Sequence, residues 1–118
     1  MPSPHIQTHL SSADVWVVSL SGEHDLTTVQ ELDDALLLVP EQAHLIVDLT
    51  RAEFIDSTTL AAMMRAGFRD GSRPTPISVA LAPGSPPERL FRLFGADRWM
   101  RTFASVEDAI AGLPARGG

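Results

Sequence analysis

The most informative stretch of this chain is Leu45-Ile46-Val47-Asp48-Leu49-Thr50-Arg51-Ala52-Glu53-Phe54-Ile55-Asp56-Ser57-Thr58-Thr59-Leu60. Its opening predicts a central strand over residues 44–49, because near-continuous Leu, Ile and Val are typical of a parallel strand covered on both faces. A short polar loop is predicted next, and Phe54 and Ile55 are then predicted to return to the core. A buried strand is thus followed closely by a polar segment at the surface.

Asp56 and Ser57 mark the predicted start of an apolar helix that runs to about residue 68. A helix N-terminus carries a partial positive charge and unpaired N–H groups, so a reachable hydroxyl there is a favourable place for a phosphate. The alternative is that Ser57 only caps the helix, which Asp56 can do equally well. One hydroxyl is enough to cap a helix. The run of three hydroxyl residues at 57–59 therefore favours a surface with a role other than folding. The pattern indicates switching by charge rather than turnover of a substrate.

The composition fits one compact domain of 118 residues, in which 44% of residues are hydrophobic. The absence of Cys excludes disulfides, thiol catalysis and thiolate metal sites. No apolar run approaches the ~20 residues that span a bilayer, and residues 1–10 lack the features of a signal peptide. These observations predict a cytoplasmic protein without a membrane partner. Separately, the two ends of the chain, at 1–4 and 114–118, are predicted to be frayed tails.

The charge argues against nucleic acid as a direct partner. The formal net charge is −6, all nine basic residues are Arg, and no basic stripe is visible. One basic cluster does occur, diluted by Glu88 and Asp97; it comprises Arg89, Arg92, Arg98 and Arg101. A solvated helix face is the preferred interpretation of that cluster over an anion site.

The rest of the chain alternates strand and helix patterns. Besides 44–49, strands are predicted at 6–10, 15–21, 76–81 and 99–103, with a turn at 21–25. Helices are predicted from 27 or 28 to 38 and at 57–68, 88–94 and 106–113. The order predicts an α/β fold in a single domain over 1–118. An N-terminal β-hairpin joins a mostly parallel mixed sheet of about five strands, with about four helices packed against it.

Local signals at the helix ends support these boundaries. Asp70-Gly71 is predicted to end the second helix, and Pro87 suits the first turn of the third. Gly95 is the expected C-terminal cap of the third helix, and Ser105 the expected N-terminal cap of the last.

Four carboxylates can meet near the strand ends; they are Asp25, Asp48, Glu53 and Asp56. Such a group serves as an acid–base pair or holds Mg²⁺ in other proteins. The preferred interpretation is simpler, with Asp48 ending a strand and Asp25 lying in a turn.

The histidines give little support for chemistry. His5 and His9 are too far apart along a strand to share a metal. His24 adjoins Asp25 and can reach Ser57 in some arrangements of the chain, so a Ser-His-Asp hydrolase is an alternative. Against it, no Gly-x-Ser-x-Gly elbow is present. No catalytic residue, metal site or cofactor is therefore predicted.

Three separated segments carry a family resemblance. They are Leu20-Ser21-Gly22-Glu23-His24-Asp25, the central signature from Asp48 to Leu60, and Leu90-Phe91-Arg92-Leu93-Phe94-Gly95-Ala96 with Ser105-Val106-Glu107-Asp108-Ala109. They resemble the Gly-Glu-x-Asp turn, the Asp-Leu-Ser…Phe-x-Asp-Ser-Ser-Gly-Leu signature and the C-terminal pattern of STAS domains. Residues 45–49 also resemble the phosphoacceptor strand of receiver domains. Receivers and haloacid-type phosphatases both need a Lys, which this chain lacks.

The STAS resemblance implies roles for particular residues. Ser57 falls on the serine that a partner kinase phosphorylates, and Asp25 falls on the acidic turn residue near it. Asp56, Thr58 and Thr59 complete the implied partner-binding surface. Thr59 stands where the signature usually has Gly, which is expected to alter how closely a partner helix approaches.

The resemblance also implies a function. The chain is similar to free-standing anti-sigma factor antagonists, which are not enzymes, rather than to transporter tails, since it begins with Met1 and has no predicted span. The implied mechanism is that the unphosphorylated protein binds an anti-sigma factor with serine/threonine kinase activity and so releases a sigma factor. Phosphorylation of Ser57 ends binding, and a PP2C-type phosphatase restores it. A STAS scaffold without phosphorylation, or a sensor of a small molecule or lipid, remains the alternative.

Overall fold

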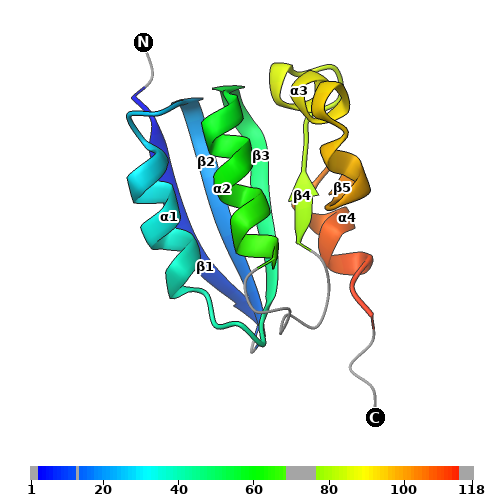
Figure 1. Ribbon diagram of the computed structural model, residues 1–118. Coiled ribbons are helices and arrows are strands. Elements are labelled where there is room, and N and C mark those ends of the chain that lie inside the picture. The colour runs from blue at the N-terminus through cyan, green and yellow to red at the C-terminus, as the bar shows by residue number, and fades with distance from the viewer. Residues whose placement is uncertain (1–2, 13, 69–76, 115–118) are drawn as a thin grey trace.

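The structure is a computed structural model that describes residues 3–12, 14–68 and 77–114 (Figure 1). Its strands are β1 (His5–Ser12), β2 (Val15–His24), β3 (His44–Ile55), β4 (Ser78–Ala80) and β5 (Arg101–Phe103). Its helices are α1 (Val29–Leu38), α2 (Ser57–Phe68), α3 (Pro86–Phe94) and α4 (Val106–Ala111), with a 3₁₀ turn, η1, at Ala96–Arg98. The predicted end of α2 at Asp70-Gly71 lies outside the described residues.

One sheet organises the domain. Its strand order is β1-β2-β3-β4-β5, with β1 antiparallel to β2 and the remaining neighbours parallel. The predicted α/β fold, a hairpin joined to a mostly parallel sheet with four helices, is confirmed.

The two faces of the sheet are covered unequally. Because side chains alternate along a strand, Val47 and Leu49 join the large core beneath α1, α2 and α3. Ile46 instead joins a small second core with Ala109 of α4. The larger core fixes α1 and α2 beside one another over the sheet (Figure 1).

Two predicted polar segments are strand instead. β2 continues through the predicted turn to His24, and β3 continues through the predicted loop to Ile55. The reason is parallel pairing between the two strands, which extends to the pair His24↔Ile55. Ile55 is buried as predicted, whereas the prediction for Phe54 was wrong, because its side chain points outward and is 44% exposed.

Other boundaries differ by a few residues. β4 and β5 are shorter than predicted, and β5 begins only at Arg101 because Trp99 and Met100 donate backbone hydrogen bonds to Ala96 in the turn before it. The last helix ends at Ala111 rather than at residue 113.

The caps predicted at Gly95 and Ser105 are confirmed, whereas Thr28, at the start of α1, makes no side-chain cap hydrogen bond. The Ser105 hydroxyl accepts from the N–H of Asp108 at 3.0 Å, and Gly95 adopts φ 66° at the end of α3. Within the described part of the chain, no helix has the length and apolar character needed to cross a membrane.

Candidate functional site

The site lies where β2 and β3 end side by side. The N–H of Asp56 donates to the carbonyl of His24 at 3.2 Å, which ties the start of α2 to the last residue of β2. Asp25 and Asp56 each follow one of these paired strands, and the Asp56 charge acts on the Asp25 carboxyl. Parallel pairing therefore brings together two predicted site residues that are far apart in the sequence.

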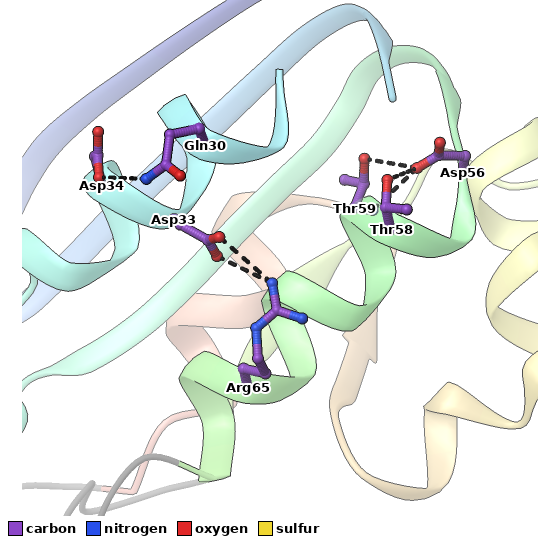
Figure 2. Close-up of polar contacts among 7 residues, drawn as sticks. All are labelled: Gln30, Asp33, Asp34, Asp56, Thr58, Thr59 and Arg65. Carbon is purple, nitrogen blue, oxygen red and sulfur yellow. Dashed lines mark hydrogen bonds and ion pairs between the residues drawn. The ribbon is translucent and has the colours of Figure 1, made fainter. Parts of the chain in front are cut away.

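Asp56, not Ser57, caps α2. Figure 2 shows the Asp56 carboxylate beside the Thr58 and Thr59 side chains. Its Oδ1 accepts from the N–H of Thr59 at 3.0 Å, from the Thr58 hydroxyl at 2.6 Å and from the Thr59 hydroxyl at 3.2 Å. The two threonines of the hydroxyl run thus hold the capping carboxylate in place.

Ser57 occupies the first turn of α2 with an exposed side chain. Its hydroxyl forms no hydrogen bond with any described residue, unlike those of Thr58 and Thr59. The interpretation of Ser57 as a mere cap is therefore wrong. The structure leaves this hydroxyl available at a helix N-terminus, where backbone N–H groups and the helix dipole favour added negative charge.

Thr59 does not belong to the surface. Its side chain is fully buried and its hydroxyl is bonded to Asp56, so direct contact with a partner is excluded by burial. This β-branched residue donates its hydroxyl hydrogen bond to Asp56 instead. Thr58 is partly buried and keeps some contact with solvent.

Asp25 is fixed by its own turn. Its Oδ1 accepts from the Thr27 hydroxyl and, at 2.8 Å, from the Thr27 N–H. These two hydrogen bonds lower the pKa of Asp25 below its ordinary value, against a smaller opposing effect of desolvation and of the neighbouring Asp56.

The pKa of Asp56 is also lowered. Burial acts to raise it, but the hydrogen bonds from Thr58 and Thr59 outweigh that effect. Both carboxylates beside Ser57 are therefore charged at neutral pH.

His24 is not positioned for catalysis. Its ring is buried, with Nε2 2.9 Å from the carbonyl of Ser21 and Nδ1 3.1 Å from the hydroxyl of Thr28. Because both ring nitrogens are engaged by Ser21 and Thr28, His24 does not serve Ser57 as a base. The Ser-His-Asp alternative is thereby excluded.

The four carboxylates do not gather. Asp48 lies within β3, where it accepts from the N–H of Thr50 at 2.9 Å, and Glu53 is exposed farther along the same strand. Among the described residues, no group of three or more His, Cys, Asp or Glu side chains is arranged to hold a metal.

Two exposed apolar side chains lie close to the site residues along the chain and were not predicted. Leu26, next to Asp25, is 69% exposed, and Phe54, two residues before Asp56, is 44% exposed. A leucine between the polar turn residues Asp25 and Thr27 was a signal that the sequence offered. Exposed apolar side chains bordered by polar groups are a feature of protein-binding surfaces.

Comparison with known proteins agrees with this arrangement. The family model described as "Mlab, STAS domain" matches residues 8–104. The chain is 32% identical over 109 residues to the anti-sigma-F factor antagonist RsfB of Mycobacterium tuberculosis, which covers 88% of this chain and 84% of that protein. It is 27% identical to an anti-sigma factor antagonist from Mycobacterium paratuberculosis of known structure, with a TM-score of 0.82 over 92% of each chain.

The phosphorylated form of Bacillus SpoIIAA shares the fold at 22% identity, with a TM-score of 0.61 over 91% of this chain and 97% of that one. Fold and matched region together define a STAS domain protein. Within that class, the chain belongs to the anti-sigma factor antagonist family, whose members are non-enzymatic regulators.

Proposed function

We propose that this protein binds an anti-sigma factor through the surface around Ser57, and that phosphorylation of Ser57 ends the binding. The observation that carries the proposal is the exposed Ser57 hydroxyl, which has no hydrogen-bond partner in the described chain while Asp56 supplies the cap. The docking surface consists of Asp25, Leu26, Phe54, Ser57 and Thr58, with Asp56 and the buried Thr59 in support.

The partner is an anti-sigma factor that is also a serine/threonine kinase. It transfers the γ-phosphoryl group of its own ATP to the Ser57 oxygen, which gives phosphoserine, ADP and the displaced hydroxyl proton. A PP2C-type phosphatase hydrolyses the phosphoserine and restores binding. This exchange of partners takes place in the cytoplasm, and the protein takes part in it as a single STAS domain. It controls transcription because it releases a sigma factor.

The charge at the site explains why phosphorylation acts on binding rather than on folding. A phosphate adds about −1.5 to −2 charge. The N-terminus of α2 offsets this by roughly 0.3–1 kcal/mol, so the fold tolerates the group. The added charge lies on the same surface as the Asp25 and Asp56 carboxylates. Bringing like charges together across an interface costs on the order of several kcal/mol.

The test uses the partner captured by the tagged chain from a lysate of its own organism, then purified. With ATP, intact mass should show one phosphate on the wild type and none on Ser57→Ala, which should still bind. Ser12→Ala, an exposed serine on β1, is the matched control and should be labelled normally. Labelling of Ser57→Ala would move the site to another residue, and absence of labelling in the wild type would favour a STAS scaffold without phosphorylation.

Ser57→Asp tests the charge argument. Its circular dichroism spectrum should match that of the wild type, and its affinity for the partner should fall by about tenfold or more. Unchanged affinity in the folded variant would show that charge at this position does not control docking.

A further inference from the structure

Strand β1 is a free edge of the sheet. It is the outermost strand and pairs only with β2. Among the described residues, none outside β2 forms a backbone hydrogen bond with any residue of His5–Ser12. Because alternate residues of an edge strand direct their N–H and C=O groups away from the sheet, β1 presents a row of donors and acceptors that a further strand can pair with.

This edge lacks the features that usually protect one. Edge strands are kept from pairing with other chains by short length, by Pro or by charged side chains, Lys above all. β1 has eight residues, His-Ile-Gln-Thr-His-Leu-Ser-Ser, without Pro, Asp, Glu, Lys or Arg. At the opposite edge, β5 has only three residues and begins with Arg101. Of the two edges, β1 is therefore the one suited to accept another strand.

Exposed leucines lie beside this edge. Ile6 packs against the large core, so the alternation of side chains places Leu10 on the same face of the sheet, the face that α1 covers (Figure 1). Leu10 is 51% exposed, and Leu38, the last residue of α1, is 76% exposed.

Both leucines belong to the same end of the sheet. Leu10 pairs with Trp16 near the start of β2, and the chain leaves α1 for the start of β3, which pairs with that end of β2. Leu37 lines the groove between α1 and α2, and Leu38 follows it about 100° farther round the helix, outside that groove. The unpaired backbone of β1 is thus accompanied by apolar side chains that a neighbouring chain can cover.

We propose that β1 of one copy pairs antiparallel with β1 of a second copy, about a twofold axis, so that two five-stranded sheets become one sheet of ten strands. A strand related to itself by a twofold axis is antiparallel to itself, and its donors then meet its own acceptors without any other sequence being needed. The contact uses the same surface of both copies, so it closes at a dimer. The inference does not depend on phosphorylation of Ser57.

The charge of the chain selects this edge for contact between copies. At a net charge of −6, two copies repel each other in most orientations. β1 brings no formally charged side chain into the contact, so repulsion is weakest there. Carboxylates on neighbouring segments, Asp14 in the hairpin turn and Glu31 and Asp34 on α1, still add repulsion. We therefore expect a weak dimer, with a dissociation constant between about 10 μM and 1 mM, whose stability rises with salt.

The alternation of side chains restricts the register. The twofold axis keeps the α1 sides of both sheets on one face, so residues of β1 can lie opposite only residues of the same face. A register centred on Thr8 sets Thr8 opposite Thr8 of the second copy, and Ile6 opposite Leu10 of the second copy on either side. A register centred on Gln7 would instead set His5 opposite His9 and leave Leu10 beyond the paired segment. The apolar pairs favour the register centred on Thr8.

The first experiment is disulfide cross-linking of the full chain. The chain contains no Cys, so Thr8→Cys introduces a single thiol at an exposed position. Residues directly opposite in an antiparallel pair have Cβ atoms about 4.5–5.5 Å apart, close to the separation that a disulfide needs. With oxidised glutathione as the oxidant, Thr8→Cys should form a covalent dimer. Thr102→Cys, at an exposed threonine on the opposite edge, is the matched control and should cross-link at least about tenfold more slowly.

The second experiment is sedimentation velocity without any cross-link. The wild-type mass should rise with concentration to that of a dimer and no further, and the association constant should increase between low salt and 0.5 M salt because no ion pair holds the contact. Thr8→Lys sets two ammonium groups opposite each other and should weaken association at least about tenfold. Thr8→Val keeps the β-branched shape and should associate at least as strongly as the wild type. Circular dichroism checks that both variants are folded.

Three results would overturn the proposal. They are a wild type that stays monomeric at about 1 mM in 0.5 M salt, a folded Thr8→Lys variant that associates like the wild type, and cross-linking of Thr8→Cys no faster than that of Thr102→Cys. The first would leave the β1 edge to a strand from a different protein. Binding of the anti-sigma factor is measured separately, so failure of self-association leaves the proposed function untouched.

Discussion

Replacement of Asp56 by Ala removes one carboxylate that serves three donors at once. The cap itself, the acceptor for the Thr59 N–H at 3.0 Å, contributes about 0.5–2 kcal/mol to the free energy of unfolding. The second loss is the hydrogen bond from the Thr59 hydroxyl. This hydroxyl is fully buried and would be left without its acceptor. A stranded buried hydroxyl costs about 1–3 kcal/mol. The Thr58 hydroxyl is partly exposed, so water can replace Asp56 there.

Asp56→Ala should therefore lower the free energy of unfolding by about 2–4 kcal/mol, out of a total of about 5–15 kcal/mol for a domain of this kind. Asp56→Asn keeps the side-chain oxygen that accepts these bonds, and should cost only about 1 kcal/mol. Urea unfolding followed by circular dichroism measures both, and the m-value should stay constant.

Thr59→Val separates the two contributions. In the Asp56→Ala background it removes the stranded hydroxyl, so the double variant should regain about 1 kcal/mol relative to Asp56→Ala alone. Glu53→Ala, at an exposed carboxylate on β3, is the matched control and should change stability by less than about 0.5 kcal/mol. A cost of Asp56→Ala no larger than that of this control, or further destabilisation by Thr59→Val in that background, would contradict the stabilising role given to the Asp56 hydrogen bonds.

Three more outcomes follow from the same structure. Ser78→Ala should raise stability by about 1 kcal/mol in thermal or urea unfolding, because the Ser78 hydroxyl is fully buried and has no hydrogen-bond partner among the described residues; a loss of stability would indicate a partner. Gly22→Ala should destabilise by more than about 1 kcal/mol, since Gly22 has φ 78° and an added Cβ would lie 3.0 Å from the Ser3 carbonyl; an unchanged urea midpoint would contradict this. Asp25 and Asp56 have lowered pKa values when folded, so their stabilising effect is complete above the ordinary value of 3.8 and is lost as the pH falls below it. Urea midpoints measured across that range should fall less steeply for Asp56→Asn than for the wild type, and equal slopes would argue against the Asp56 contribution.

Local sequence patterns were enough to predict most of the secondary structure. The apolar run at 44–49, the Gly95 cap and the Ser105 cap each depend on neighbours within one turn or strand, so the sequence alone placed them correctly. The ends of β2 and β3 were misjudged because polar residues look like loop when read in isolation. Pairing between the two strands supplies the hydrogen bonds that keep those residues extended, and periodicity does not reveal that pairing.

The site divides in the same way. The sequence placed a hydroxyl run at the start of a helix, next to an acidic residue, and its motif indicated the family. It did not distinguish Asp56 from Ser57 as the cap, nor the exposed Ser57 from the buried Thr59. Those distinctions depend on which side of α2 packs against the core, and therefore on atoms supplied by other elements.

The amino-acid sequence was enough to predict the order of strands and helices, the absence of thiol chemistry and the position of the hydroxyl run, because each is a property of composition or short-range pattern. Packing between elements was needed to show that the Asp56 charge acts on the Asp25 carboxyl, that His24 is buried, and that Leu26 and Phe54 are exposed. The physical reason is the register of β2 against β3, which fixes contacts between residues about thirty positions apart.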